Sequence, residues 1–158
     1  MNTPEMSLER FHLIVGDLRD AREFADYILT RRLHEKHGQT KELIHRAFNL
    51  SMIISYSRPF MRNLEGPERE YDYSPISYLA KFVLGKEGST LHKTIIAQRN
   101  EIHAHSPTGR RFPRPPTKDR VAISIDVFMP LSLADTRTLR SNIKSWLDYL
   151  EPLKSQFS

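Results

Sequence analysis

The sequence contains no cysteine, which excludes disulfide bonds and thiolate metal sites. A chain without disulfides fits the reducing cytoplasm, so we predict a cytoplasmic protein. Long hydrophobic runs are also missing, and no stretch approaches the roughly 18 apolar residues of a membrane span. Residues 1–5 lack the charged and apolar regions of a signal peptide. We therefore expect neither secretion nor membrane insertion.

The motifs of nucleotide and metal chemistry are missing as well. The chain has no glycine-rich phosphate loop and no nucleotide-transferase motif, which excludes the ATPase and kinase classes. His103 and His105 form an alternating pair, but no Asp or Cys lies beside them to complete a metal site. The other histidines form no ligand pair with a nearby carboxylate: His12, His34, His37, His45 and His92. We predict no metal and no cofactor.

What is present fits one globular domain spanning residues 1–158. The chain has 158 residues and 39% hydrophobic residues, enough for an ordinary core. Its net charge of +5 permits a polyanionic partner without requiring one. One proline-rich segment contains a single Asp and five basic residues: Arg110, Arg111, Arg114, Lys118 and Arg120. This segment could guide a nucleic-acid backbone, or it could be a solvated loop.

Three- and four-residue spacing of apolar side chains predicts a mainly helical chain. The first helix should begin at Thr3-Pro4-Glu5, reach about Arg32, and have Gly16 as a weak point; its core positions are Phe11, Ile14, Val15, Leu18, Ala25, Ile28 and Leu29. The second should begin near Thr40, and Pro59 should either end it or kink it, which places Arg58 at a distorted helix end. Its predicted core face is Leu43, Ile44, Ala47, Leu50 and Ile54.

Further helices are predicted on both sides of one strand. A short helix from Ser74-Pro75 should close at Gly85, and Ser89 or Thr90 can cap the next one. Residues 121–129 alternate in the period-two pattern of a strand, which could pair near Phe112 or with a second subunit. The last helix begins at Ser132 and has a wide apolar face: Leu139, Ile143, Trp146, Leu147, Leu150 and Leu153.

The segment Arg99-Asn100-Glu101-Ile102-His103-Ala104-His105 concentrates chemically active side chains at the end of a predicted helix. A guanidinium beside an imidazole offers a phosphate clamp and a proton shuttle, which suit phosphodiester cleavage without a metal. An Arg followed six positions later by a His also arises by chance, as Arg31 and His37 show. The Asn100 that follows Arg99 and the apolar stripe on the same helix distinguish the second occurrence.

This segment resembles the signature of HEPN domains, in which an Arg and a polar residue such as Asn precede a His by four to six residues. Tyr56-Ser57-Arg58-Pro59-Phe60 and the helix order are similar to small stand-alone HEPN proteins of abortive-infection systems. The resemblance implies an all-α, HEPN-like bundle of about five helices, with a short strand or hairpin before the C-terminal helix. It also implies a homodimer and, in many members, a metal-independent endoribonuclease acting in defence, stress response or as a toxin.

In such a nuclease His105 would transfer protons, Arg99 would stabilise charge at phosphorus, and Asn100 would orient the phosphate or the imidazole. His103 is either a second proton-transfer group or a packing residue. RNA would be the substrate, with Arg110, Arg111, Arg114 and Lys118 as further contacts. In the toxin branch of the family a Tyr follows the His and is the site of neutralising modification. Ser106-Pro107 stands there in this chain, so we do not expect neutralisation by that modification. The sequence does not decide whether the protein has an antitoxin. The alternative is a non-catalytic dimeric helical module that binds nucleic acid or a partner protein.

Overall fold

The computed structural model describes residues 7–61, 76–104 and 130–156, with side chains up to residue 100 in the second range. These residues form four α-helices: α1 (Leu8–Thr30), α2 (Gln39–Ser57), α3 (Ala80–Ala104) and α4 (Leu133–Leu150). Short 3₁₀ turns accompany them: η1 (Leu33–Glu35), η2 (Arg58–Phe60), η3 (Ser77–Leu79) and η4 (Glu151–Gln156). No strand occurs within these ranges, so the all-α prediction is confirmed. The strand predicted at 121–129 lies outside them.

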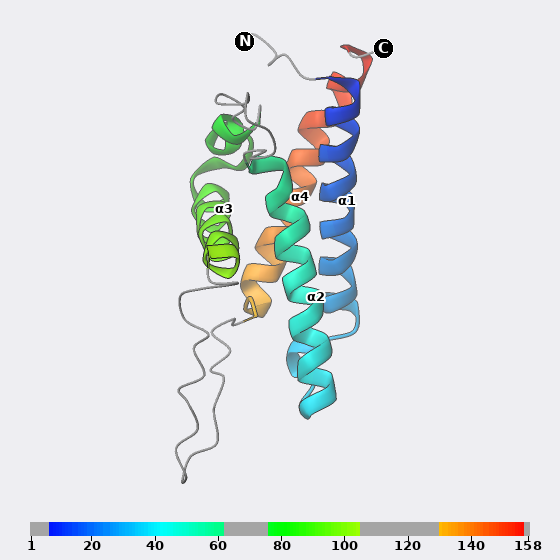
Figure 1. The fold of residues 1–158 in the computed structure, drawn as a ribbon, viewed down its shortest axis with the longest axis vertical. Helices are drawn as coiled ribbons and strands as arrows, with labels where there is room; N and C mark the ends of the chain where they lie inside the picture. The colour runs from blue at the N-terminus through cyan, green and yellow to red at the C-terminus, as the bar shows by residue number, and fades with distance from the viewer. Residues whose placement is uncertain (1–6, 62–75, 105–129, 157–158) are drawn as a thin grey trace.

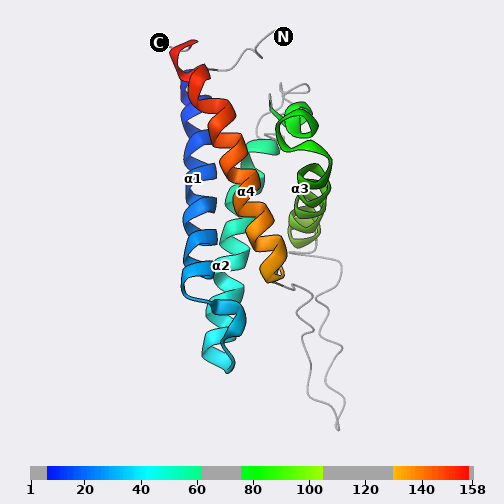
Figure 2. The same cartoon turned by 180° about the vertical axis from the view of Figure 1, so that it is seen from behind.

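Helices α1, α2 and α4 lie side by side, and α3 lies beside α2 and α4 (Figures 1 and 2). Helix α1 contacts both α2 and α4, and α3 contacts the same two helices. The fully buried side chains come from all four helices and include Leu18, Met52, Ile95 and Trp146. One continuous apolar core therefore joins helices that are far apart in the sequence.

Helix α1 follows its predicted pattern closely. Ser7 is its N-cap, and the Ser7 hydroxyl accepts a hydrogen bond from the Arg10 amide at 3.1 Å. The helix thus begins at Leu8, and the start proposed at residues 3–5 lies outside the described part of the chain. It continues through Gly16 without a break. Five of the predicted core positions are buried: Phe11, Ile14, Leu18, Ala25 and Ile28.

Helix α2 buries a different face from the one predicted. The side chains of Leu43 and Ile44 are 67% and 39% exposed, and Ala47 is also exposed. The buried face contains polar residues together with apolar ones: Asn49, Met52, Ile53, Ser55, Tyr56 and Ser57. Burial of the polar residues is possible because they find partners. The Asn49 side-chain oxygen accepts from the Leu131 amide at 3.0 Å, for example.

Helix α3 is bent where the sequence predicts a helix end. Gly85 adopts φ 66° and ψ −168°, a conformation outside the helical region that glycine adopts without steric cost. Beyond the bend, Gly88 packs against Asn142 of α4, whose side-chain amide donates to the Gly88 carbonyl at 3.0 Å. A Cβ at Gly88 would lie 2.6 Å from the Asn142 oxygen, so glycine permits this close approach of α3 and α4.

Helix α4 confirms its prediction. The Ser132 hydroxyl accepts from the Asp135 amide at 3.0 Å and donates to the Asp135 carboxylate at 2.7 Å. Leu139, Ile143, Trp146 and Leu150 are fully buried. The apolar stripe of α4 is therefore core.

Among the helices that the structure describes, none combines the length and the apolar character needed to cross a membrane.

Candidate anion-binding site

Arg99 and Asn100 lie together near the end of α3, one turn beyond the fully buried Ile95. The Arg99 Nη1 donates to the Asn100 side-chain oxygen at 3.5 Å. The Arg99 Nε is buried and has no hydrogen-bond partner among the described residues. Partial burial, and then the positive charge of Arg58, lower the pKa of the Arg99 guanidinium. The site thus contains two cations close enough to repel each other.

Arg58 reaches this site from the end of α2. Pro59 follows it, and the α-helix ends there in the 3₁₀ turn η2, which is the first of the two outcomes that the sequence allows. The Arg58 Nη1 donates to the Asp17 carboxylate of α1 at 3.3 Å. The Arg58 side chain is 58% exposed, whereas the Asp17 side chain is 21% exposed. Burial raises the pKa of Asp17, although the bond and charge of Arg58 oppose this effect.

A buried polar pair joins α2 to α3, two residues before Arg58 and seven residues before Arg99. The Tyr56 hydroxyl and the His92 Nδ1 lie 2.9 Å apart. Burial lowers the pKa of His92 to about 4, so the ring is neutral at pH 7 and Nδ1 can accept the hydroxyl proton. The Phe60 ring packs edge-on against His92 with ring centres 4.6 Å apart, and it also contacts Trp146 of α4. These contacts hold Tyr56, two positions before Arg58, against α3.

The arrangement suits the binding of a singly or doubly charged oxyanion. Arg58 and Arg99 each present a guanidinium, and among the described residues Asp17 is the carboxylate that pairs with one of them. Asp20 and Arg10 add one charge of each sign near Asp17. A guanidinium matches the geometry of two phosphate oxygens and stays charged at neutral pH. A phosphate between the two arginines would relieve their mutual repulsion and supply the acceptor that the Arg99 Nε lacks.

The structure places some of the predicted site residues and leaves others untested. It brings Arg99 and Asn100 together on α3. The backbone of His103 belongs to α3, whereas His105, Arg110, Arg111, Arg114 and Lys118 lie outside the described residues. Sequence reasoning missed the role of Asp17 and the proximity of Arg58 to Arg99. Arg58 stands out in the sequence as a distorted helix end, but Asp17 has no sequence signal because it lies 41 positions away.

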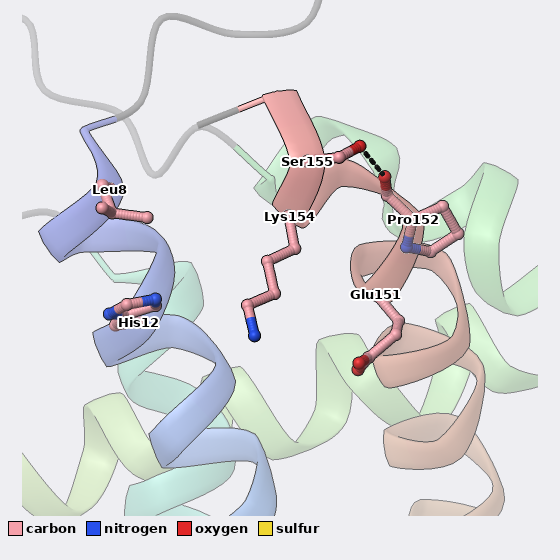
Figure 3. Close-up of a pocket in the computed structure, with 6 residues that line it drawn as sticks. All are labelled: Leu8, His12, Glu151, Pro152, Lys154 and Ser155. Carbon is pink, nitrogen blue, oxygen red and sulfur yellow. Dashed lines mark hydrogen bonds between the residues drawn. The ribbon is translucent and has the colours of Figure 1, made fainter. Parts of the chain in front are cut away.

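Two other polar clusters are weaker candidates for a functional site. A shallow pocket between α1 and η4 is lined by Leu8, His12, Glu151, Pro152, Lys154 and Ser155. In it Lys154 extends toward the space between His12 and Glu151, so opposite charges offset each other (Figure 3). The His34 and His45 rings lie 4.6 Å apart, and His34 contacts the Thr136 hydroxyl. Within the described ranges no three His, Cys, Asp or Glu residues converge as metal ligands.

Comparison with protein-family models, with curated proteins and with solved structures finds no match to this chain. The case for the site therefore depends on its own residues.

Proposed function

We propose that the protein is a metal-independent endoribonuclease of HEPN type, acting in defence, in a stress response or as a toxin. The observation that supports this most is the state of Arg99. Its Nε is buried, has no hydrogen-bond partner in the part of the chain that the structure describes, and lies within the electrostatic influence of a second cation, Arg58. Leaving such a donor unpaired costs about 1–3 kcal/mol, so a buried donor without a partner points to a ligand that supplies the acceptor.

The proposed reaction uses the RNA itself as nucleophile. His105 takes the proton from a ribose 2′-hydroxyl, and the 2′-oxygen attacks the neighbouring phosphorus. The bond from phosphorus to the 5′-oxygen breaks, and the leaving oxygen takes a proton from an imidazolium. Arg99 stabilises the charge on the phosphoryl oxygens, and Asn100 orients the phosphate. His103 is a second candidate for proton transfer. The products are a 2′,3′-cyclic phosphate and a 5′-hydroxyl, and DNA is not cleaved.

The proposal includes a HEPN-like bundle with the predicted strand, and a homodimer in which the two 99–105 segments lie close together. The exposed apolar side of α2, with Leu43, Ile44 and Ala47, supports association because it leaves apolar surface to bury. Multi-angle light scattering at micromolar concentration should give the mass of two chains. A mass of one chain would count against the dimer.

The basic segment with Arg110, Arg111, Arg114 and Lys118 is proposed to contact the RNA backbone outside the cleavage site. Such contacts are electrostatic and weaken as salt rises. Alanine at the three arginines together should reduce the salt dependence of RNA binding. An unchanged dependence would mean that the segment is a solvated loop.

The nuclease is tested by replacing the proposed proton-transfer group. His105→Ala should lower RNA cleavage by at least about a hundredfold, because general acid–base catalysis contributes factors of this order. Cleavage by the wild type should persist in EDTA. RNA ends should be sequenced from cells that express wild type or His105→Ala, since such a nuclease can be selective for one RNA. The melting temperatures of the two proteins serve as the control for folding.

A non-catalytic dimeric module is the second candidate, and the exposed side of α2 favours it too. Such a module would bind nucleic acid or a partner protein, and an antitoxin is one such partner. Identical RNA ends from wild type and His105→Ala, with RNA binding retained, would support this candidate and contradict the nuclease.

A further inference from the structure

Arg58 at the end of α2 and Arg99 near the end of α3 lie close enough to repel each other, and in the described part of the chain one ion pair, with Asp17, joins a carboxylate to either of them. The Arg58 Nη1 donates to the Asp17 carboxylate at 3.3 Å. A guanidinium has five N–H donors, so most of those of Arg58 have no acceptor among residues 7–61, 76–100 and 130–156, and the side chain is 58% exposed. Arg99 has an amide oxygen as its described acceptor, at 3.5 Å, and its Nε has none. Both side chains can therefore donate to one ligand.

We propose that Arg58 is a second phosphate-binding residue of the site, so that the guanidinium groups of Arg58 and Arg99 together hold the backbone of an RNA strand. The identity of the ligand as RNA depends on the proposed function. The anion itself follows from the charges and unpaired donors on the two helices. Asp17 is a positioning residue, because it fixes the direction of Arg58 without facing the ligand as a donor.

The molecule contains a matched arrangement that lacks these properties. Asp26 of α1 forms ion pairs with Arg22 of the same helix, at 3.7 Å, and with Arg140 of α4. This cluster also has two arginines and one aspartate, and its side chains are about half exposed. Both of its arginines, however, pair with the carboxylate. Arg140→Ala is therefore the control for Arg58→Ala, since it removes the same charge and also breaks a pair between helices.

The experiment measures binding without cleavage. All proteins carry His105→Ala, and the probe is a fluorescent ten-nucleotide single-stranded RNA followed by anisotropy at several salt concentrations. Arg58→Ala and Arg99→Ala should each weaken binding by about tenfold or more, the usual effect of a lost charge-assisted hydrogen bond. Each should also reduce the salt slope by about 0.7, because one phosphate contact is lost. Arg140→Ala should bind as the parent protein does, and thermal melting should show that all variants are folded.

The outcomes separate this inference from the nuclease. The inference is overturned if Arg58→Ala matches Arg140→Ala while Arg99→Ala weakens binding, and the proposed function then stands without it. It is also overturned if the parent protein binds inorganic phosphate but no RNA. Weakening by both Arg58→Ala and Arg99→Ala, from a wild type that produces no cyclic phosphate ends, would support the binding site and refute the nuclease.

Discussion

Two opposite faces of α1 each present an aspartate near two arginines, but the arginines are fully paired with the aspartate on one face only. Asp17 and Asp26 are nine residues apart, which places them roughly 180° apart around the helix. Asp26 pairs with both of its neighbouring arginines, Arg22 and Arg140. Asp17 pairs with Arg58, while Arg99 beside it pairs with an amide instead. The number of charges is therefore a poor guide to an anion site, and the number of donors without an acceptor is a better one.

Hydrogen-bonded polar groups are buried near both arginines. Near Arg58 the Tyr56 hydroxyl and the His92 Nδ1 lie 2.9 Å apart, and both residues are buried. Near Arg140 the buried positions of α4 include Thr136 and Asn142, and the Asn142 amide donates to the Gly88 carbonyl at 3.0 Å. Burial of polar groups therefore does not distinguish the two arginines, whereas the donors without a described acceptor do.

The largest contrast is expected in cleavage. Arg99→Ala should lower the cleavage rate by about a hundredfold or more, as removal of a donor that stabilises developing charge does in other enzymes. Arg140→Ala should leave the rate within about twofold, because its guanidinium is already paired on the opposite side of α1. Single-turnover cleavage of one RNA oligonucleotide measures both. Equal losses in the two variants would mean that overall charge, not the site, controls the rate.

The second contrast concerns stability against pH. Folding lowers the pKa of His92 from its ordinary value of 6.5 to about 4, so the folded state resists protonation. The stability that the neutral ring provides is complete above pH 6.5 and is lost as pH falls toward 4. Between pH 7 and pH 5 this loss should be about 2 kcal/mol in the free energy of unfolding.

Urea unfolding at the two pH values measures this loss. His92→Gln should remove that part of the pH dependence, whereas His12→Gln, at an exposed position of α1, should keep it. The same pH dependence in wild type and His92→Gln would show that His92 does not titrate in this way.

The smallest contrast is expected in RNA affinity, between variants of Asp17 and Asp26. Asp17→Asn removes a negative charge beside Arg58 but keeps a side-chain oxygen that can accept from Arg58. In the His105→Ala background this variant should therefore bind RNA about threefold more tightly. Asp26→Asn should change affinity less, because it lies on the far face of α1. Anisotropy at low salt resolves a threefold change. Weaker binding of Asp17→Asn would mean that fixing Arg58 in place matters more than the charge of Asp17.

Local patterns in the sequence predict much of the fold. The apolar spacing of α1 and the cap and apolar spacing of α4 follow from neighbouring residues. The sequence also predicts a helix end at Gly85, where α3 instead bends and continues, and a distorted helix end at Arg58, where the turn η2 begins. The core face of α2 is predicted wrongly because periodicity counts apolar residues and ignores hydrogen bonds. Ser57, for instance, is buried because its hydroxyl donates to the Ile53 carbonyl at 2.7 Å.

The candidate site could be predicted only in part, for a similar reason. Arg99 and Asn100 are neighbours in the chain, so their sequence pattern shows them together. Arg58 and Asp17 meet across 41 positions, through the packing of η2 on α1, and no local pattern contains that contact. The proximity of Arg58 to Arg99 depends on the Tyr56–His92 contact between α2 and α3 in the same way.

The close approach at Gly88 has a mechanical consequence for the site. Gly88 and Arg99 belong to one straight stretch of α3, eleven residues or roughly 16 Å apart along the axis. If this stretch rotates about the Gly88–Asn142 contact, a tilt of only about 4° displaces Arg99 by about 1 Å. Shifts of that size can reduce catalysis about a hundredfold. Gly88, eleven residues before Arg99 on the same helix, thus controls the position of the arginine although it has no side chain.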